Sequence, residues 1–153
     1  MGFKEPSHFF KFQKFTHSYP LCRYDPTIGE CRLSSTGERI TGYSHPSIAT
    51  VIELGFLCNN AQITHGTVVG QPTEGALMVL ALKVQLPVER INDSCKRLKE
   101  IPFSSETKWM AIQLERAGGG TEVIVKGALD KVVQMCVGYM DGHGQAQPLG
   151  RWM

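Results

Sequence analysis

Side chains of the kinds that bind a purine nucleotide occur between residues 74 and 126 of this 153-residue sequence. Phe103 offers an aromatic ring for stacking, and Lys108 and Lys126 offer positive charge for phosphates. Glu74 offers an acceptor for an exocyclic amine. The same residues also fit a structure without a ligand, in which Phe103 is core, the lysines end strands in solvent, and Glu74 stabilises a helix N-terminus. Residue types alone favour this second interpretation.

Other chemistries lack their characteristic patterns. Lys126-Gly127 follows a predicted strand, but no preceding glycine stands at phosphate-loop spacing and Ala128 replaces the required Ser or Thr. Ser104 and Ser105 lack a Gly-x-Ser-x-Gly turn. The five cysteines form no Cys-x-x-Cys pair and are expected to be reduced thiols: Cys22, Cys31, Cys58, Cys95 and Cys136. The sequence therefore predicts no catalytic residue and no metal site.

Length and composition indicate one globular domain. Sixteen Lys and Arg residues against fourteen Asp and Glu give a formal charge of +2, without the basic excess of a dedicated nucleic-acid-binding protein. The sequence has no apolar run of about 18 residues, the length that a membrane-spanning helix needs, and its first residues do not resemble a signal peptide. We expect a soluble chain with no nucleic-acid partner and no direct membrane insertion.

Three helices are predicted between residues 44 and 96. Apolar residues recur at helical spacing over residues 44–58, with Ser44 as N-cap. A second helix, capped by the Thr73 hydroxyl, is apolar on nearly every side as far as residue 84, which predicts that it is buried. A shorter polar segment, residues 88–96, is predicted to be helical after Pro87.

The remaining elements are mainly strands. Strand-length runs bounded by turn residues occur at residues 30–33, 38–41, 98–103, 109–114 and 121–125. The first two are predicted to form a hairpin, and the last two are joined by the Gly118-Gly119-Gly120 turn. A helix is predicted over residues 128–136. Because this order lacks β-α-β alternation, the predicted class is α+β, with an antiparallel β-sheet flanked by helices.

Four segments become informative when they are read together. They are Cys58-Asn59-Asn60-Ala61, Gly70-Gln71-Pro72-Thr73-Glu74-Gly75-Ala76-Leu77, Pro102-Phe103-Ser104-Ser105-Glu106 followed by Lys108-Trp109-Met110-Ala111, and Val125-Lys126-Gly127-Ala128. Their order and spacing resemble the nucleotide-binding (N) domain of P-type cation-transporting ATPases, and are most similar to the secretory-pathway calcium and manganese ATPases of the Golgi. Residues 24–30 also resemble an early turn of that family, with one extra residue, so the resemblance covers residues 24–148.

The resemblance implies an ATP-binding domain and assigns roles to five residues. It implies that Phe103 stacks on adenine, that Lys126 lies beside the ring at the floor of the pocket, and that Lys108 lies near the ring or the α-phosphate. It places Glu74 near the adenine amino group. Gly127 would be small because a Cβ there would obstruct a planar base. The implied ligand is ATP, as Mg-ATP in the whole enzyme.

The rest of the family pattern is matched only in part. The phosphorylated Asp of the family's Asp-Lys-Thr-Gly motif has no counterpart, since Asp130-Lys131 is followed by two valines. The closing strand and its arginine are also unmatched, so we expect a C-terminally truncated N-domain at residues 24–148, after an uncertain lead-in at 1–23 and before a tail at 149–153. The resemblance implies that ATP is held for an Asp in a separate phosphorylation domain. Implied partners are the phosphorylation and actuator domains, at the cytosolic face of a secretory-pathway or Golgi membrane.

Two alternatives remain open at this point. The chain could be a regulatory or interaction fragment that keeps the fold but has little nucleotide affinity, binding partners through an open sheet edge. It could also be a free-standing nucleotide hydrolase, which is disfavoured because no base, nucleophile or metal-binding carboxylate pair is evident.

Overall fold

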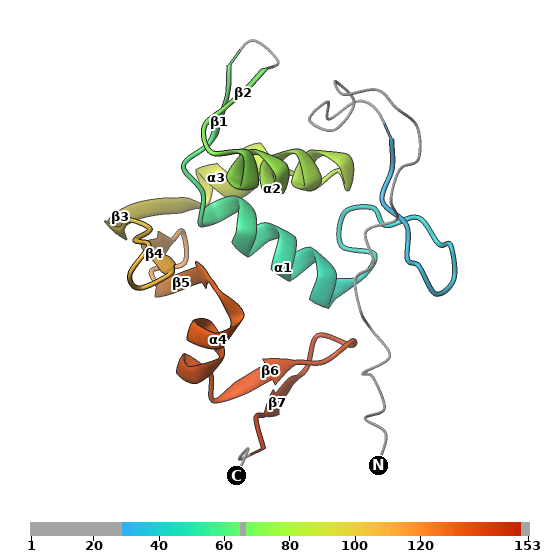
Figure 1. Ribbon diagram of the computed structural model, residues 1–153. Coiled ribbons are helices and arrows are strands. Elements are labelled where there is room, and N and C mark those ends of the chain that lie inside the picture. The colour runs from blue at the N-terminus through green and yellow to red at the C-terminus, as the bar shows by residue number, and fades with distance from the viewer. Residues whose placement is uncertain (1–28, 65–66, 151–153) are drawn as a thin grey trace.

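Two helices and a three-stranded sheet form the centre of the fold (Figure 1). The structure is a computed structural model and describes residues 29–64 and 67–150. Helix α1 (Pro46–Leu57) lies beside helix α2 (Pro72–Lys83) and also contacts the sheet. The sheet has the antiparallel order β3-β4-β5, and its strands are β3 (Cys95–Ile101), β4 (Trp109–Arg116) and β5 (Thr121–Gly127). The predicted α+β class is therefore confirmed.

The hydrophobic core lies between α1, α2 and one face of the sheet. Alternate residues of β4 and β5 supply that face with Met110, Ile112, Leu114 and Ile124. Ile112 and Ile124 are directly opposite each other, and residues opposite each other in an antiparallel pair share a face. Ala49, Ile52 and Leu57 of α1 and Ala81 of α2 belong to the same buried cluster. This packing fixes the two helices on the sheet and so determines where their first turns lie.

Shorter elements surround this centre. Strands β1 (Gln62–Thr64) and β2 (Thr67–Val69) follow α1 in the chain and form an antiparallel pair before α2. Helix α3 (Val88–Asp93) precedes β3. After β5 come helix α4 (Leu129–Val132), a 3-10 turn (Val133–Met135) and the hairpin of β6 (Gly138–Met140) with β7 (Ala146–Pro148). No helix in the described part of the chain is long and apolar enough to cross a membrane.

Several predicted boundaries are corrected by the structure. The N-cap of α1 is His45 rather than Ser44, and Thr73 lies inside α2, whose N-cap is Gln71. Proline in the first turn of each helix supplies the fixed φ that begins it, and neither N-cap side chain makes a capping hydrogen bond. The predicted hairpin at residues 30–41 is present but short: an antiparallel bridge joins Arg32 and Arg39, and the Leu33 and Ile40 amides donate to the Glu38 and Cys31 carbonyls, each at 2.8 Å.

The later elements differ in length from the prediction. The third helix ends at Asp93, because Cys95 already pairs with Arg116 in the sheet. The predicted helix over residues 128–136 is divided into α4 and the 3-10 turn. The predicted lead-in at residues 1–23, the first part of the turn at 24–30 and the last three residues of the predicted tail lie outside the described residues.

Candidate functional site

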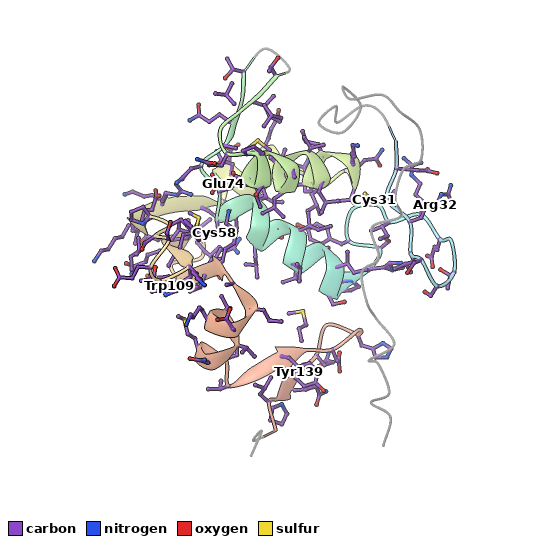
Figure 2. The ribbon with its side chains drawn as sticks, in the orientation of Figure 1. Cys31, Arg32, Cys58, Glu74, Trp109 and Tyr139 are labelled. Atoms are coloured by element: carbon purple, nitrogen blue, oxygen red, sulfur yellow. The ribbon has the colours of Figure 1, made fainter. Side chains whose placement is uncertain are left out.

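An ion pair joins two of the predicted site residues across the fold. Lys126 on β5 places its Nζ 3.0 Å from Oε1 of Glu74, in the first turn of α2. Lys126 is opposite the buried Met110 and therefore shares the core-facing side of the sheet. In Figure 2, Glu74 is labelled at the end of α2 that lies nearer the strands. Their side chains are only 13% (Glu74) and 24% (Lys126) exposed, so the pair is partly shielded from water.

The connection between β3 and β4 contributes the other two side chains. Ile101, Ala111 and Val125 form one row across the sheet, so this connection lies at the sheet end where β5 finishes. Phe103 is in the connection and is 60% exposed, so its ring is accessible from solvent. Lys108 ends the connection and is also exposed.

Hydrogen bonds to Ser104 hold the backbone of this connection in one conformation. The Ser104 hydroxyl accepts hydrogen bonds from the amides of Glu106 and Thr107, at 3.1 and 3.3 Å, and the Ser104 carbonyl accepts one from the Lys108 amide at 2.7 Å. Lys108 has a φ of 61°, in the left-handed region that side chains other than glycine seldom adopt. Such strain persists only where neighbouring contacts impose it, and it is common at functional sites.

Gly127 is in direct contact with the end of that connection. A Cβ at Gly127 would lie 2.5 Å from both the Lys108 carbonyl oxygen and the Trp109 Cβ. The next residue, Ala128, donates its amide to the same carbonyl at 2.9 Å. The backbone therefore requires glycine here through strand packing, a reason separate from the expected approach of a base. All five predicted residues come to one end of the sheet, with contacts between Glu74 and Lys126 and between Gly127 and Lys108.

A buried thiol lies near the ion pair. Cys58 follows α1, is fully buried, and its Sγ is 3.8 Å from the carbonyl oxygen of Ile124. Burial raises the pKa of the Cys58 thiol, while the positive charges of Lys126 and Arg97 act in the opposite direction. The thiol is therefore neutral near pH 7 and contributes packing rather than charge.

Sequence reasoning missed the residues that support Glu74. Asn59 is the one buried polar residue in the part of the chain that the structure describes, and its Nδ2 donates to the Glu74 carbonyl at 2.8 Å. Arg97 on β3 donates to the carbonyl oxygens of Leu57 and Asn59, at 3.2 and 2.8 Å. The pair Asn59-Asn60 directly after an amphipathic helix was the available signal, since asparagine side chains readily bond nearby backbone groups. Nothing in the sequence around Arg97 indicated its contacts.

Comparison with known proteins places this arrangement in a family. The family model described as P-type ATPase, cytoplasmic domain N, matches residues 47–153, which include all five predicted site residues. This chain belongs to the P-type ATPase family. The predicted resemblance is confirmed, and the helix pair and sheet described above are parts of a P-type ATPase domain N.

Individual relatives of this P-type ATPase domain are calcium- and cation-transporting ATPases. The human calcium-transporting ATPase type 2C member 2 is 45% identical over 121 residues, which cover 78% of this chain and 12% of that protein. The Bos taurus calcium-transporting ATPase type 2C member 1 is 38% identical over 116 residues, or 74% of this chain and 12% of that protein. A probable cation-transporting ATPase F of Mycobacterium bovis is 38% identical over 64% of the chain and 11% of its own length. The chain thus spans about an eighth of these relatives.

Potential metal ligands are dispersed in this P-type ATPase domain. Across residues 29–64 and 67–150, no group of three or more His, Cys, Asp and Glu side chains is placed to hold a metal ion. The four described cysteines, which are Cys31, Cys58, Cys95 and Cys136, are free thiols.

Proposed function

We propose that this domain binds ATP at the sheet end formed by Glu74, Phe103, Lys108, Lys126 and Gly127. The observation that carries the proposal is the ion pair between Glu74 and Lys126, because it brings α2 to the strand end at which the Phe103–Lys108 connection also lies. A carboxylate, an exposed ring and positive charge thus come from elements that meet at the same end of the sheet. This combination suits adenine and its phosphates.

Each side chain has a distinct role in this proposal. Phe103 stacks on the adenine ring, and Glu74 accepts a hydrogen bond from the exocyclic amine. Lys126 holds the Glu74 carboxylate beside the ring, and Lys108 attracts the phosphates. Gly127 keeps the end of β5 close to the Lys108 backbone. Mg²⁺ enters as part of Mg-ATP, bridging phosphate oxygens.

In the whole pump, we propose that the domain holds ATP while its γ-phosphate reaches an Asp in a separate phosphorylation domain. Phosphoryl transfer depends mainly on positioning and on neutralising charge, so a nucleotide-binding domain contributes by orienting its substrate. The similarity to calcium-transporting ATPases of type 2C supports calcium transport as the activity of the whole protein. The phosphorylation and actuator domains are then its partners, at the cytosolic face of a secretory-pathway or Golgi membrane.

The test is a titration of the isotope-labelled chain with ATP, and with GTP as control, followed by backbone amide shifts. We expect saturable shifts at residues 74, 103–108 and 126–127 that are larger for ATP, with weak affinity because the contacts are few. A dispersed spectrum that does not respond to ATP would refute nucleotide binding.

An interaction domain with little nucleotide affinity is the second candidate. It is favoured by one observation, the exposed apolar residues that follow β5, which include Leu129 at 81% and Val137 at 93% exposure. The same titration separates the two candidates. This one predicts a folded spectrum with no shifts at the five site residues.

A further inference from the structure

A single buried asparagine connects the end of α1 to the first turn of α2. Asn59 is 8% exposed, and its Nδ2 donates to the carbonyl oxygens of Glu74 at 2.8 Å and Gly55 at 3.4 Å. Its Oδ1 accepts the Ala61 amide at 2.8 Å. Both amide hydrogens and the carbonyl oxygen of this side chain therefore have partners, as a buried polar group requires.

The asparagine is itself held in place by the sheet. Arg97 on β3 donates to the backbone carbonyl of Asn59 at 2.8 Å and to that of Leu57 at 3.2 Å. A charged donor gives stronger hydrogen bonds than a neutral one. Asn59 thus links the Glu74 backbone to β3, the strand that leads into the connection containing Phe103.

The side chain of Glu74 is fixed at its other end by Lys126. Its Oε1 accepts from Nζ at 3.0 Å, and among the described residues Lys126 is the only hydrogen-bonding partner of this carboxylate. Oε2 is then available to a ligand. With the backbone held by Asn59 and one oxygen held by Lys126, the carboxylate has little freedom to move.

We propose that Asn59 is a positioning residue that makes this site select a 6-aminopurine over a 6-oxopurine. The inference rests on the proposed function, since it needs a purine at the site. A carboxylate can accept from the exocyclic amine of adenine or, after a small displacement, from the N1–H of a 6-oxopurine. A carboxylate held at the amine would instead face the oxygen of a 6-oxopurine, which repels it. Selectivity therefore depends on how firmly Glu74 is held.

The test replaces Asn59 by a residue of the same shape. Asn59→Asp keeps an acceptor for the Ala61 amide but removes the donor to the Glu74 carbonyl. Asn60→Asp is the matched control, because it makes the same change at an exposed neighbour whose Nδ2 donates to Glu100 instead. The Asn60 Oδ1 accepts from Arg97 at 2.7 Å, and aspartate keeps that acceptor. Dissociation constants for ATP and for inosine triphosphate, which carries a 6-oxopurine, are measured on the full chain and both variants by amide shifts.

For the natural chain we expect ATP to bind at least about tenfold more tightly than inosine triphosphate, the scale of one hydrogen bond to a charged group. Asn59→Asp should bring the ratio of the two constants to within about twofold, while Asn60→Asp should leave it unchanged. Glu74→Gln should also reduce the ratio, and combining it with Asn59→Asp should add little, because the two residues act as one unit.

The outcomes distinguish failure of the Asn59 role from failure of the proposed nucleotide binding. If the natural chain binds neither nucleotide, the proposed function fails and the inference fails with it. If the natural chain prefers ATP and folded Asn59→Asp keeps that ratio, only the inference is overturned. The same holds if both affinities weaken equally, because a purely structural role would produce that result.

A measurement on the natural chain covers the case in which Asn59→Asp does not fold. Hydrogen exchange of the Asn59 side-chain amide should slow when ATP is added, because a bound amine completes the hydrogen bonds of Glu74 and reduces local opening. Inosine triphosphate at equal occupancy should slow it much less. Equal protection by both nucleotides would overturn the inference.

Discussion

Phe103 is a residue whose substitution should change ATP binding without changing stability. Its side chain is 60% exposed, so it contributes little to the core. In the proposed site its ring stacks on adenine, and an aromatic side chain stacked on a base contributes about 1–3 kcal/mol. Phe103→Ala should therefore weaken ATP binding by about tenfold or more, with the thermal midpoint nearly unchanged. Calorimetric titration and thermal unfolding measure the two quantities.

Val123→Ala is the matched control for that variant. Val123 is an apolar side chain on β5 with 62% exposure, and it is opposite Gln113, away from the proposed site. Its removal should leave ATP affinity unchanged. An equal loss of affinity in both variants, or a large fall in the thermal midpoint of Phe103→Ala, would contradict the stacking role.

At the residue scale, the sequence singles out side chains whose type carries chemistry, and their binding roles stay a prediction. Glu74 and Lys126 were chosen for charge, and the structure joins them at 3.0 Å although 52 positions separate them. Asn59 was quoted only as part of a motif, because its importance comes from burial and from a partner 15 residues away. Neither is visible in residue type.

At the scale of elements, the junction of β4 with β5 depends on one glycine. A Cβ at Gly127 would meet the Lys108 carbonyl and the Trp109 backbone, which cannot move without disturbing the strand pair. Gly127→Ala should lower the free energy of unfolding by about 1–3 kcal/mol, the range for overpacking. It should also shift the amides of Lys108 and Ala128. Chemical denaturation and amide spectra provide the measurements.

Gly118→Ala supplies the comparison for Gly127→Ala. Gly118 lies in the turn between β4 and β5, where an added Cβ would meet nothing within 4 Å. Its substitution should change stability by no more than about 0.5 kcal/mol. Similar losses in the two variants would show that strand packing is not the reason for Gly127.

The β6–β7 hairpin depends on an acidic side chain and should respond to pH. Asp141 Oδ1 accepts the amides of His143 and Gln145, and Oδ2 accepts from the Gln147 side chain, each at 2.9 Å. These hydrogen bonds lower the pKa of Asp141 below its ordinary value of 3.8. A lowered pKa in the folded state means that the stabilisation is present above that ordinary value and is lost as pH falls through the lowered one. We expect the amides of Tyr139 and Gln147 to lose protection below about pH 4.

Asp141→Asn tests the cause of this pH dependence. Asparagine keeps one acceptor oxygen but does not titrate in this range, so the hairpin amides should become insensitive to pH between about 2 and 5. Loss of protection at the same pH in the variant would assign the effect to another group.

Helices and strands could be predicted from the sequence only where their residue pattern was long enough to show a period. Helices α1 and α2 were predicted because twelve residues each give a clear helical pattern or an apolar run with a proline start. Strands β1, β2, β6 and β7 have three residues each, too few for any period to show. They form because pairing and neighbouring elements stabilise them, for example where Gly144 approaches Pro46 at the start of α1. Such long-range contacts are not readable in sequence.

Over the whole molecule, the core face of β5 has charges at both ends and an apolar centre. Glu122, Ile124 and Lys126 alternate on this face, with Ile124 in the core. At one end Lys126 pairs with Glu74 of α2. At the other, Arg116 bridges Glu122 and Glu53 of α1. Each helix is thus tied to the sheet by a carboxylate, at opposite ends of the same face.

Substitutions at the two ends should affect nucleotide selectivity differently, because only the Lys126 end belongs to the proposed site. Arg116→Met keeps the length of the side chain but leaves the carboxylates of Glu53 and Glu122 without their shared cation, and Glu53 is only 18% exposed. We expect the free energy of unfolding to fall by about 1–3 kcal/mol, the scale for a shielded polar group that loses its partner. The ratio of ATP to inosine triphosphate affinity should stay that of the natural chain.

Lys126→Met makes the same kind of change at the other end, with a different expected effect on nucleotide selectivity. It leaves Glu74 without its one hydrogen-bonding partner among the described residues, so the carboxylate is free to turn and the preference for ATP should fall to within about twofold. Both variants remove one cation from a partly buried pair, so comparable losses of stability are expected and only selectivity should distinguish them. Denaturant unfolding together with the two nucleotide titrations measures both properties on the same samples. If Arg116→Met reduced selectivity as much as Lys126→Met, nucleotide selectivity would follow overall stability rather than the local placement of Glu74.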